Sequence, residues 1–296
     1  MLPRRNILIF HQAALGDFIT TWPVAMAMGR VFAQSRVMYV TGSDKGRLAE
    51  DVIGVEGVSA DDGWHALFGN AEPPENVARV LRGTQCVVLF AENDEPNFVA
   101  GLVKHCGDIP LIQIRPKPPA AVHVLDHQLA QLDAHGKLRS YVEQMQTLLK
   151  THGFGRRGNA GEGVLIHPGS GSPAKNWCVE HFVELGTQLV AAGKVVRFVV
   201  GEVERDRWPA SDISRLAAVA EVVMPDTLPA LRKLIAGSHS FVGNDSGPTH
   251  LAAALGVRTV ALFGDASDSA QWRPSGPAVE VRSIAEPPAA IAAIIG

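Results

Sequence analysis

The segment from Gly243 to Gly256, GNDSGPTHLAAALG, combines residue types that begin a helix with types that favour an anion. Asp245 or Ser246 can serve as the N-cap, and Pro248 suits an early helix position. The backbone N–H groups of a helix N-terminus, together with the helix dipole, attract phosphate. The segment therefore predicts a phosphate-binding helix start. The alternative is a capped helix with a purely structural role.

A second candidate is the segment HPGSGSPAKNW at residues 167–177, which follows the apolar run GVLI. Its small residues, Gly169 to Ser172, would let backbone amides approach an anion closely, and Lys175 can supply positive charge. The order of residues is not that of a P-loop, which argues against a standard nucleoside triphosphatase site. The alternative is a flexible loop that carries a solvated lysine.

A third candidate is AALGDFITTWP at residues 13–23, after the first apolar run. Gly16 would allow a tight turn from strand to helix, and Asp17 falls at or near a helix N-terminus. The aspartate is either an N-cap or a carboxylate that acts as a general base. The G-x-G-x-x-G pattern of dinucleotide-binding proteins is absent from this segment.

The sequence gives little support for a metal site or for a hydrolase site. No Asp-x-Asp triplet and no G-x-S-x-G elbow occurs, which argues against one common metal-binding device and against an α/β hydrolase. His123 and His127 could share a helix face, but they lack the glutamate and the third ligand of a zinc site. We therefore expect no metal ion.

Composition narrows the class of protein. The 296 residues are 46% hydrophobic and 19% charged with a formal net charge of −3, which is typical of a globular protein and disfavours nucleic acid as a partner. Three widely spaced cysteines fit a reducing cytoplasm. No apolar run approaches the roughly 18–20 residues of a membrane helix. We therefore expect a cytoplasmic protein.

Apolar runs alternate with amphipathic stretches, as in βα units around a parallel sheet. Buried strands are expected at NILIF, RVMYVTG, CVVLFA, PLIQI, GVLIH, VVRFVV, VVM, SFVG and TVALFG. Helices are expected at about 16–33, 44–52, from 74, 127–150, 179–192, 228–236 and 248–255. The Gly-rich segment 152–163 reads as a linker. This predicts an α/β chain of two Rossmann-like domains, 1–153 and 154–296, with parallel sheets that face a cleft between them.

The three motifs, in this order, resemble the bacterial heptosyltransferase family, the ADP-heptose:lipopolysaccharide heptosyltransferases of glycosyltransferase family 9. The most specific part is FVGNDSGPTHLAAALGVRTVALFG at 241–264, supported by HPGSGSPAKNW and by the Gly16-Asp17 to Pro23 pattern. The resemblance implies a GT-B fold, with the acceptor on the N-terminal domain and the nucleotide sugar on the C-terminal one. It also implies sugar transfer without a metal or a cofactor and with inversion at the anomeric carbon.

The resemblance assigns roles to individual residues. Asp17 matches the family's general base, and Lys175 matches a residue that offsets charge on the leaving diphosphate. Glu204, or Glu202 if the alignment slips, matches a carboxylate that holds the ribose. The donor-binding positions that the family implies are Gly16, Ser170, Lys175, Glu204, Asp226, Thr227, Asp245, Ser246, Gly247, Pro248 and His250.

One departure concerns the acceptor. The family often has Arg or Lys after the first strand, where this chain has His11-Gln12, and the basic candidates nearby are Arg47, Arg115 and Lys117. The family implies ADP-heptose as donor, a lipopolysaccharide or other saccharide or lipid-linked acceptor, and it leaves room for peripheral contact with the inner face of the inner membrane. The alternatives are a catalytically silent nucleotide-sugar-binding protein and a UDP-sugar epimerase of the GT-B type.

Overall fold

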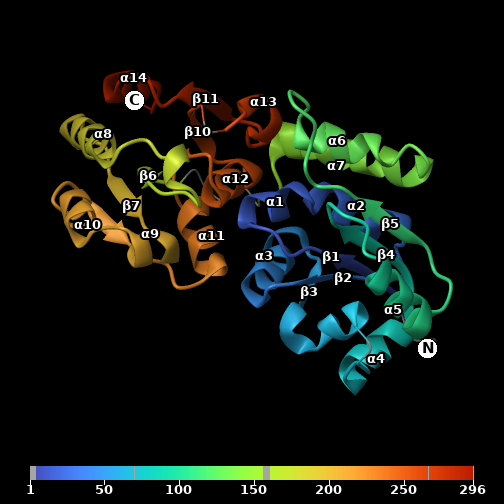
Figure 1. Ribbon diagram of the computed structural model, residues 1–296. Coiled ribbons are helices and arrows are strands. Elements are labelled where there is room, and N and C mark those ends of the chain that lie inside the picture. The colour runs from blue at the N-terminus through green and yellow to red at the C-terminus, as the bar shows by residue number, and fades with distance from the viewer. Residues whose placement is uncertain (1–4, 70, 156–160, 266, 296) are drawn as a thin grey trace. The chain divides into compact units, whose positions relative to one another are not determined.

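The computed structural model describes residues 5–69, 71–155, 161–265 and 267–295. The chain forms two compact units, Met1–Thr147 and Leu148–Gly296. Each unit is a parallel β-sheet covered by helices (Figure 1). Residues 156–160, in the middle of the expected linker, lie outside the described residues. The units divide at 147 and 148, and the expected boundary at 153 and 154 stays a prediction.

The first sheet has the strand order β3-β2-β1-β4-β5, and its neighbouring strands all run parallel. Its strands are β1 (Asn6–Phe10), β2 (Arg36–Thr41), β3 (Glu56–Ser59), β4 (Thr84–Phe90) and β5 (Leu111–Ile114). Its helices are α1 (Leu15–Thr20), α2 (Trp22–Val31), α3 (Ser43–Ile53), α4 (Glu75–Arg82), α5 (Pro96–Cys106), α6 (Val124–Ala130) and α7 (Gly136–His152), with 3-10 turns η1 (Ala60–Asp62) and η2 (Trp64–Phe68). The strand order reverses between β1 and β4, where a ligand crevice is expected in such a sheet.

Side chains of the first sheet alternate between its two faces, as the pleat requires. Phe10 and Val40 pack into the layer that α4 and α5 cover, together with Phe98 of α5. Tyr39 points to the other layer, where its ring lies 4.8 Å from that of Phe18 in α1, centroid to centroid. The ends of β1 and β2 are therefore buried on both faces, and the loops that follow them start from fixed positions.

The second sheet has the order β11-β10-β9-β6-β7-β8, again with every neighbouring pair parallel. Its strands are β6 (Val164–His167), β7 (Val196–Val199), β8 (Glu221–Val223), β9 (Ser240–Asn244), β10 (Arg258–Phe263) and β11 (Val279–Ser283). Its helices are α8 (Val179–Ala191), α9 (Glu202–Arg207), α10 (Ala210–Ala217), α11 (Leu228–Ala236), α12 (Gly247–Ala254), α13 (Ser269–Trp272) and α14 (Pro288–Ile295), with the 3-10 turn η3 (Pro173–Lys175). Here the order reverses between β6 and β9.

The second core is built largely by α8 and α14. Phe182 and Leu185 of α8 and Ile291 of α14 pack with Ile166 and Phe198 of the sheet. In another layer of the same unit α12 packs against α11 and against strands β9 and β10. The residues of α12 from Thr249 to Ala254 are all buried, which fixes the helix against the sheet directly after the end of β9.

The expected strands are confirmed, whereas the helix expected at about 16–33 is two helices. The break falls at Thr21, whose N–H donates to the carbonyl of Phe18. Pro23 has no N–H to donate to Ile19, so one continuous helix would lose a hydrogen bond there. Gly16 lies in the first turn of α1, and the expectation that it forms the turn before the helix is wrong.

The single helix expected at about 127–150 is also two helices, α6 and α7. Between them, the side chain of Gln131 accepts from the backbone N–H of Arg115 at 2.8 Å and donates to its carbonyl at 3.0 Å. Those bonds tie the break to the end of β5, and Gly136 lowers the local preference for helix by about 1 kcal/mol. Strands β3 and β11 were not expected from the apolar runs, because both are edge strands with little buried surface.

Candidate functional site

The two phosphate-type motifs lie side by side in the second unit. β6 ends at His167 and leads into the loop 168–177, while β9 ends at Asn244 and leads into α12. β6 and β9 are neighbours, with His167 opposite Gly243. Both loops therefore leave the carboxyl edge of the sheet at the point where the strand order reverses, the usual ligand crevice of an open parallel sheet.

A network of charged and polar side chains joins these loops. Lys175 Nζ lies 2.7 Å from Oδ2 of Asp245, and Ser267 donates to the same oxygen. His250 Nε2 lies 3.8 Å from the other carboxylate oxygen, Oδ1. Burial by itself raises the pKa of Asp245, but His250, Lys175 and Ser267 outweigh it and hold that pKa well below the ordinary value. Asp245 is therefore a buried, permanently charged anchor for a lysine that is 34% exposed.

The helix start itself has fewer backbone donors than the motif suggests. Ser246 is the N-cap of α12, but its side chain makes no capping hydrogen bond, and Asp245 is not the cap. The N–H groups of Thr249 and His250 both donate to the carbonyl of Ser246 at 3.1 Å. Pro248 has no N–H to offer. An anion at this terminus would therefore rely on the helix dipole and on side chains such as Lys175.

Asn244, which was not among the expected site residues, fixes the loop 168–177 to the end of β9. Its Oδ1 accepts from the backbone N–H of Trp177 at 2.9 Å, and its Nδ2 donates to the carbonyl of Pro168 at 2.8 Å. The side chain is buried. An asparagine at the end of a strand, before a Gly-rich turn, is the signal that could have indicated this role. Asn244 thus sets the loop that carries Lys175.

Glu204 is brought to the same edge of the sheet, but it faces protein groups. Its Oε2 accepts from the N–H of Gly201 at 2.8 Å and lies 3.7 Å from Nε2 of His167. His167 Nδ1 in turn lies 3.3 Å from the hydroxyl of Ser246. Burial raises the pKa of Glu204, yet His167 and the Gly201 N–H leave that pKa below its ordinary value. A Cβ on Gly169 would lie 1.8 Å from Glu204 Oε1, so only glycine fits beside the carboxylate.

The remaining donor-binding candidates of this unit either lie further along the sheet edge or form hydrogen bonds within their own loops. Ser170 Oγ donates to the carbonyl of Ser172 at 2.7 Å and accepts from its N–H at 3.2 Å, which closes a turn in the first loop. Asp226 is exposed, and Thr227 caps α11 by accepting from the N–H of Ala230 at 3.2 Å. Asp226 and Thr227 follow β8, two strands away from β6.

Asp17 lies in the first unit, in the first turn of α1, where Ala14 is the N-cap. Asp17 is therefore not the cap, although its charge is well placed for the helix dipole. Lys45 interacts electrostatically with it: burial lowers the pKa of Lys45 and the charge of Asp17 acts in the opposite direction. Lys45 Nζ donates to the carbonyl of Ala13 at 2.7 Å. The loop before α1 is thus pinned by a lysine from α3.

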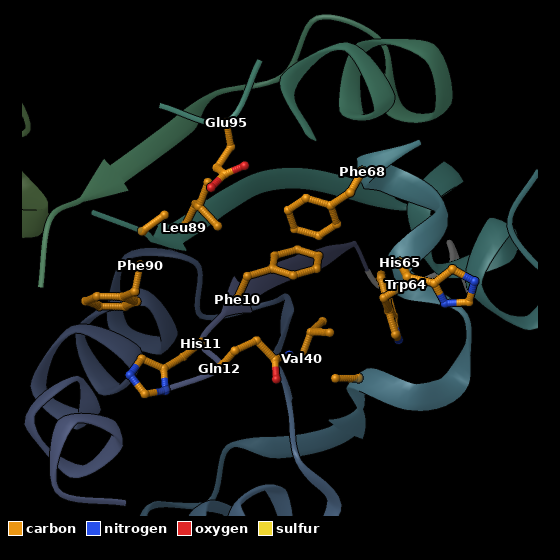
Figure 2. Close-up of a pocket in the computed structure, with 12 residues that line it drawn as sticks. Phe10, His11, Gln12, Val40, Trp64, His65, Phe68, Leu89, Phe90 and Glu95 are labelled. Atoms are coloured by element: carbon orange, nitrogen blue, oxygen red, sulfur yellow. The ribbon is translucent and has the colours of Figure 1, made fainter. Parts of the chain in front are cut away.

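A cavity of about 330 Å³ opens beside this loop, at the carboxyl ends of the paired strands β1 and β4 (Figure 2). Phe10 and Phe68 point into it, whereas the ring of His11 points away from that of Phe10. His11 lies between Phe18 and Phe90, with ring centroids 5.5 and 5.9 Å away. Burial, helped by Lys45, lowers the pKa of His11 to about 3, so its imidazole is neutral near pH 7.

Within the described residues, no group of three or more His, Cys, Asp or Glu side chains is placed to hold a metal ion. Nor is any helix in the described part of the chain long and apolar enough to cross a membrane.

Two Rossmann-like parallel sheets, one of them with a charged cluster at its strand switch, define an α/β protein of the GT-B type. Residues 123–291 match the family described as glycosyltransferase family 9 (heptosyltransferase). The chain therefore belongs to glycosyltransferase family 9, as the three motifs suggested. A curated relative, lipopolysaccharide heptosyltransferase 1 of Pseudomonas aeruginosa, is 37% identical over 105 residues. That match spans 34% of this chain and 28% of the relative.

Solved structures confirm the fold. ADP-heptose lipopolysaccharide heptosyltransferase II of E. coli matches with a TM-score of 0.68 and 17% identity, over 94% of this chain and 90% of that one. E. coli heptosyltransferase WaaC with ADP matches with a TM-score of 0.64 and 16% identity, over 98% of both chains. The expected α/β architecture with two Rossmann-like units of the GT-B type is confirmed.

Proposed function

We propose that this protein transfers a sugar from a nucleoside diphosphate to a hydroxyl group of an acceptor. The observation that carries the proposal is the cluster of Lys175, Asp245 and His250 at the start of α12, where the second sheet reverses its strand order. Family membership supports it. We propose ADP-heptose as the donor and a saccharide, lipopolysaccharide included, as the acceptor, because relatives of the same family are named for that chemistry.

In the proposed reaction the acceptor oxygen attacks the anomeric carbon while the bond from that carbon to the diphosphate oxygen breaks. The diphosphate leaves with the electron pair and gains negative charge, which Lys175 offsets. Asp17 takes the proton of the acceptor hydroxyl. A single displacement inverts the anomeric centre. Two carboxylates thus have different tasks: Asp17 accepts a proton, and Asp245 holds Lys175 in place.

The proposal needs no metal ion, because Lys175 and the dipole of α12 supply positive charge to the leaving group. Ser170 and Ser246 belong to the loops around the phosphates, and Glu204 is proposed to sit at the ribose. Asp226 and Thr227, at the end of β8, are proposed to contact the base. These assignments come from the resemblance to the family, and the residues follow the successive strands β9, β6, β7 and β8 along one sheet.

A panel of nucleotide sugars tests the proposal. A donor at 100 times its dissociation constant should stabilise the protein by about 2.7 kcal/mol in a thermal-shift assay. Release of nucleoside diphosphate should then depend on an added acceptor and should survive a metal chelator. No stabilisation by any ADP-, UDP- or GDP-sugar would contradict the proposal. So would the appearance of an isomerised sugar nucleotide without acceptor.

A further inference from the structure

The cavity of the first unit lies where that sheet reverses its strand order. Its walls come from the ends of β1 and β4, at Phe10 and Leu89, and from η2, at Trp64 and Phe68. The loop that leaves the cavity wall at Gln12 leads directly into the helix that carries Asp17. The volume, about 330 Å³, lies in the range of small-molecule sites. The cavity is therefore the natural place for a part of the acceptor.

The walls of the cavity are apolar and aromatic. Phe10 contacts the rings of Trp64 and Phe98 edge to face, with centroids 5.7 and 4.9 Å apart. Gly63 makes this wall possible, since it joins η1 to η2 at φ 103°, a conformation that favours glycine. Such a wall gains free energy by covering apolar surface of a ligand, and it offers few hydrogen bonds to a polar one.

The charges around the cavity disfavour an anion. Glu95 contributes a carboxylate to the wall, and among the described residues that line the cavity there is no lysine or arginine. His11 is neutral near pH 7 because burial lowers its pKa to about 3. Lys45 acts on His11 from nearby, but its ammonium donates to the carbonyl of Ala13 at 2.7 Å. A phosphorylated or carboxylated group would meet neither lysine nor arginine among these lining residues, and His65 is the other histidine in the wall.

The apolar wall of the cavity reaches the surface at Phe68. Phe68 lines the cavity and is 44% exposed, and its ring lies 4.9 Å from that of Phe98, centroid to centroid. Phe98 belongs to α5, which packs against η2 and begins directly after Glu95. Phe98 itself is fully buried, so the exposed part of this aromatic pair is the ring of Phe68. An apolar group seated in the cavity could therefore extend over Phe68 toward solvent.

We propose that this cavity binds an uncharged hydrocarbon chain carried by a hydroxyl-bearing acceptor, and that Phe68 selects for it. The inference rests on the proposed transfer function. It narrows the proposed saccharide acceptors to neutral amphiphiles and thereby leaves out anionic lipopolysaccharide. The polar head of such an acceptor would lie toward Gln12, whose exposed amide can donate and accept hydrogen bonds. Burial of each methylene strengthens binding by a factor of roughly four, since it is worth about 0.8 kcal/mol.

Calorimetric titration with octyl β-glucoside below its micellar concentration tests the inference, with methyl β-glucoside and glucose 6-phosphate as comparisons. We expect octyl β-glucoside to bind at one site and at least about tenfold more tightly than methyl β-glucoside. Glucose 6-phosphate should bind no more tightly than methyl β-glucoside. Equal affinity for the octyl and methyl glucosides, or tighter binding of the phosphate, would overturn the inference.

Substitutions at Phe68 test whether octyl β-glucoside binds in the cavity. Phe68→Ser should lower the affinity for octyl β-glucoside about tenfold, and Phe68→Leu should largely keep the affinity of the unsubstituted protein. Val190→Ser is the matched control, because Val190 is also 44% exposed but lies on α8 of the other unit. Donor binding, measured by thermal shift with ADP-sugars on the same samples, should be unchanged in all three variants. If the unsubstituted protein binds no ADP-sugar, the transfer function alone is refuted. If Phe68→Ser binds octyl β-glucoside with unchanged affinity, the hydrocarbon site alone is refuted.

Discussion

Lys175 and Asp245 lie 70 residues apart in the chain, yet their side chains meet at 2.7 Å. They meet because the strands that precede them, β6 and β9, are neighbours at the point where the second sheet reverses its order. Asn244 reinforces the contact by bonding to the backbone on the Lys175 loop at Trp177. In the proposed function, the ion pair holds the ammonium in one place before the donor phosphate binds, so less side-chain entropy is lost on binding.

The first prediction concerns this ion pair. Lys175→Ala should lower turnover by about 10²–10³-fold, because the charge that develops on the leaving diphosphate loses its partner. Turnover and donor affinity, measured together, check the prediction. The control is Arg215→Ala, which removes a 2.6 Å pair with exposed Glu180 in the same unit and should change neither quantity. Equal effects of the two substitutions would mean that Lys175 has only a structural role.

The second prediction separates a general base from a helix-stabilising charge. Asp17→Asn should lower turnover by about 10²–10⁴-fold while leaving donor affinity intact. Asp44→Asn is the matched control, since Asp44 also lies in the first turn of a helix, α3. Loss of a favourable dipole interaction should cost each variant about 0.3–1 kcal/mol in the free energy of unfolding. If both variants keep full turnover, Asp17 is not the base.

The third prediction concerns the space beside Glu204. Gly169→Ala would place a Cβ 1.8 Å from Glu204 Oε1, so the carboxylate must move away from His167 and Gly201. We expect a loss of about 1–3 kcal/mol in the free energy of unfolding, as is usual for an overpacked site. Urea denaturation measures it. Gly171→Ala, where a Cβ has no neighbour within 4 Å, should stay within about 0.5 kcal/mol of the unsubstituted protein.

The fourth prediction is a pH dependence of stability. Burial lowers the pKa of His11 to about 3, whereas an unfolded histidine titrates near 6.5. As the pH falls below about 6.5, His11 becomes protonated in the unfolded chain but stays neutral in the folded chain. The free energy of unfolding therefore decreases between about pH 6.5 and pH 3. Between pH 7 and pH 5 the loss from this group should be about 2 kcal/mol.

His11→Phe provides the test of that prediction. Both ring nitrogens of His11 are buried without a hydrogen-bond partner, and the ring lies between Phe18 and Phe90. A phenyl ring should therefore fit with no loss of stability at pH 7. Chemical denaturation at several pH values should show a shallower decline toward pH 5 in the variant. If the free energy of unfolding falls equally with pH in His11→Phe and in the unsubstituted protein, groups other than His11 cause the pH dependence.

Several features of this protein could be predicted from the sequence. The alternation of apolar runs indicated two parallel sheets, because strands buried on both faces are continuous in Val, Ile and Leu. The order of three motifs indicated the family, which the match over residues 123–291 confirms. Helix boundaries were predicted less well than strands. Gly16 lies inside a helix and not in the turn before it. Gln131 bonds to Arg115 after β5, at a point where the apolar periodicity alone would continue the helix.

The tertiary structure decided which of these residues act together. Only the pairing of β6 with β9 brings Lys175 to Asp245, and only the path of α9 turns Glu204 toward His167 and Gly169. The cavity beside Phe10 likewise depends on the pairing of β1 with β4, which brings Phe10 and Leu89 together, and on the 3-10 turn that carries Phe68. Residue types and spacing along the chain determine which elements form, because propensity and periodicity are local. Contacts between distant segments depend on the order of strands in a sheet, and that order appears only when the chain has folded.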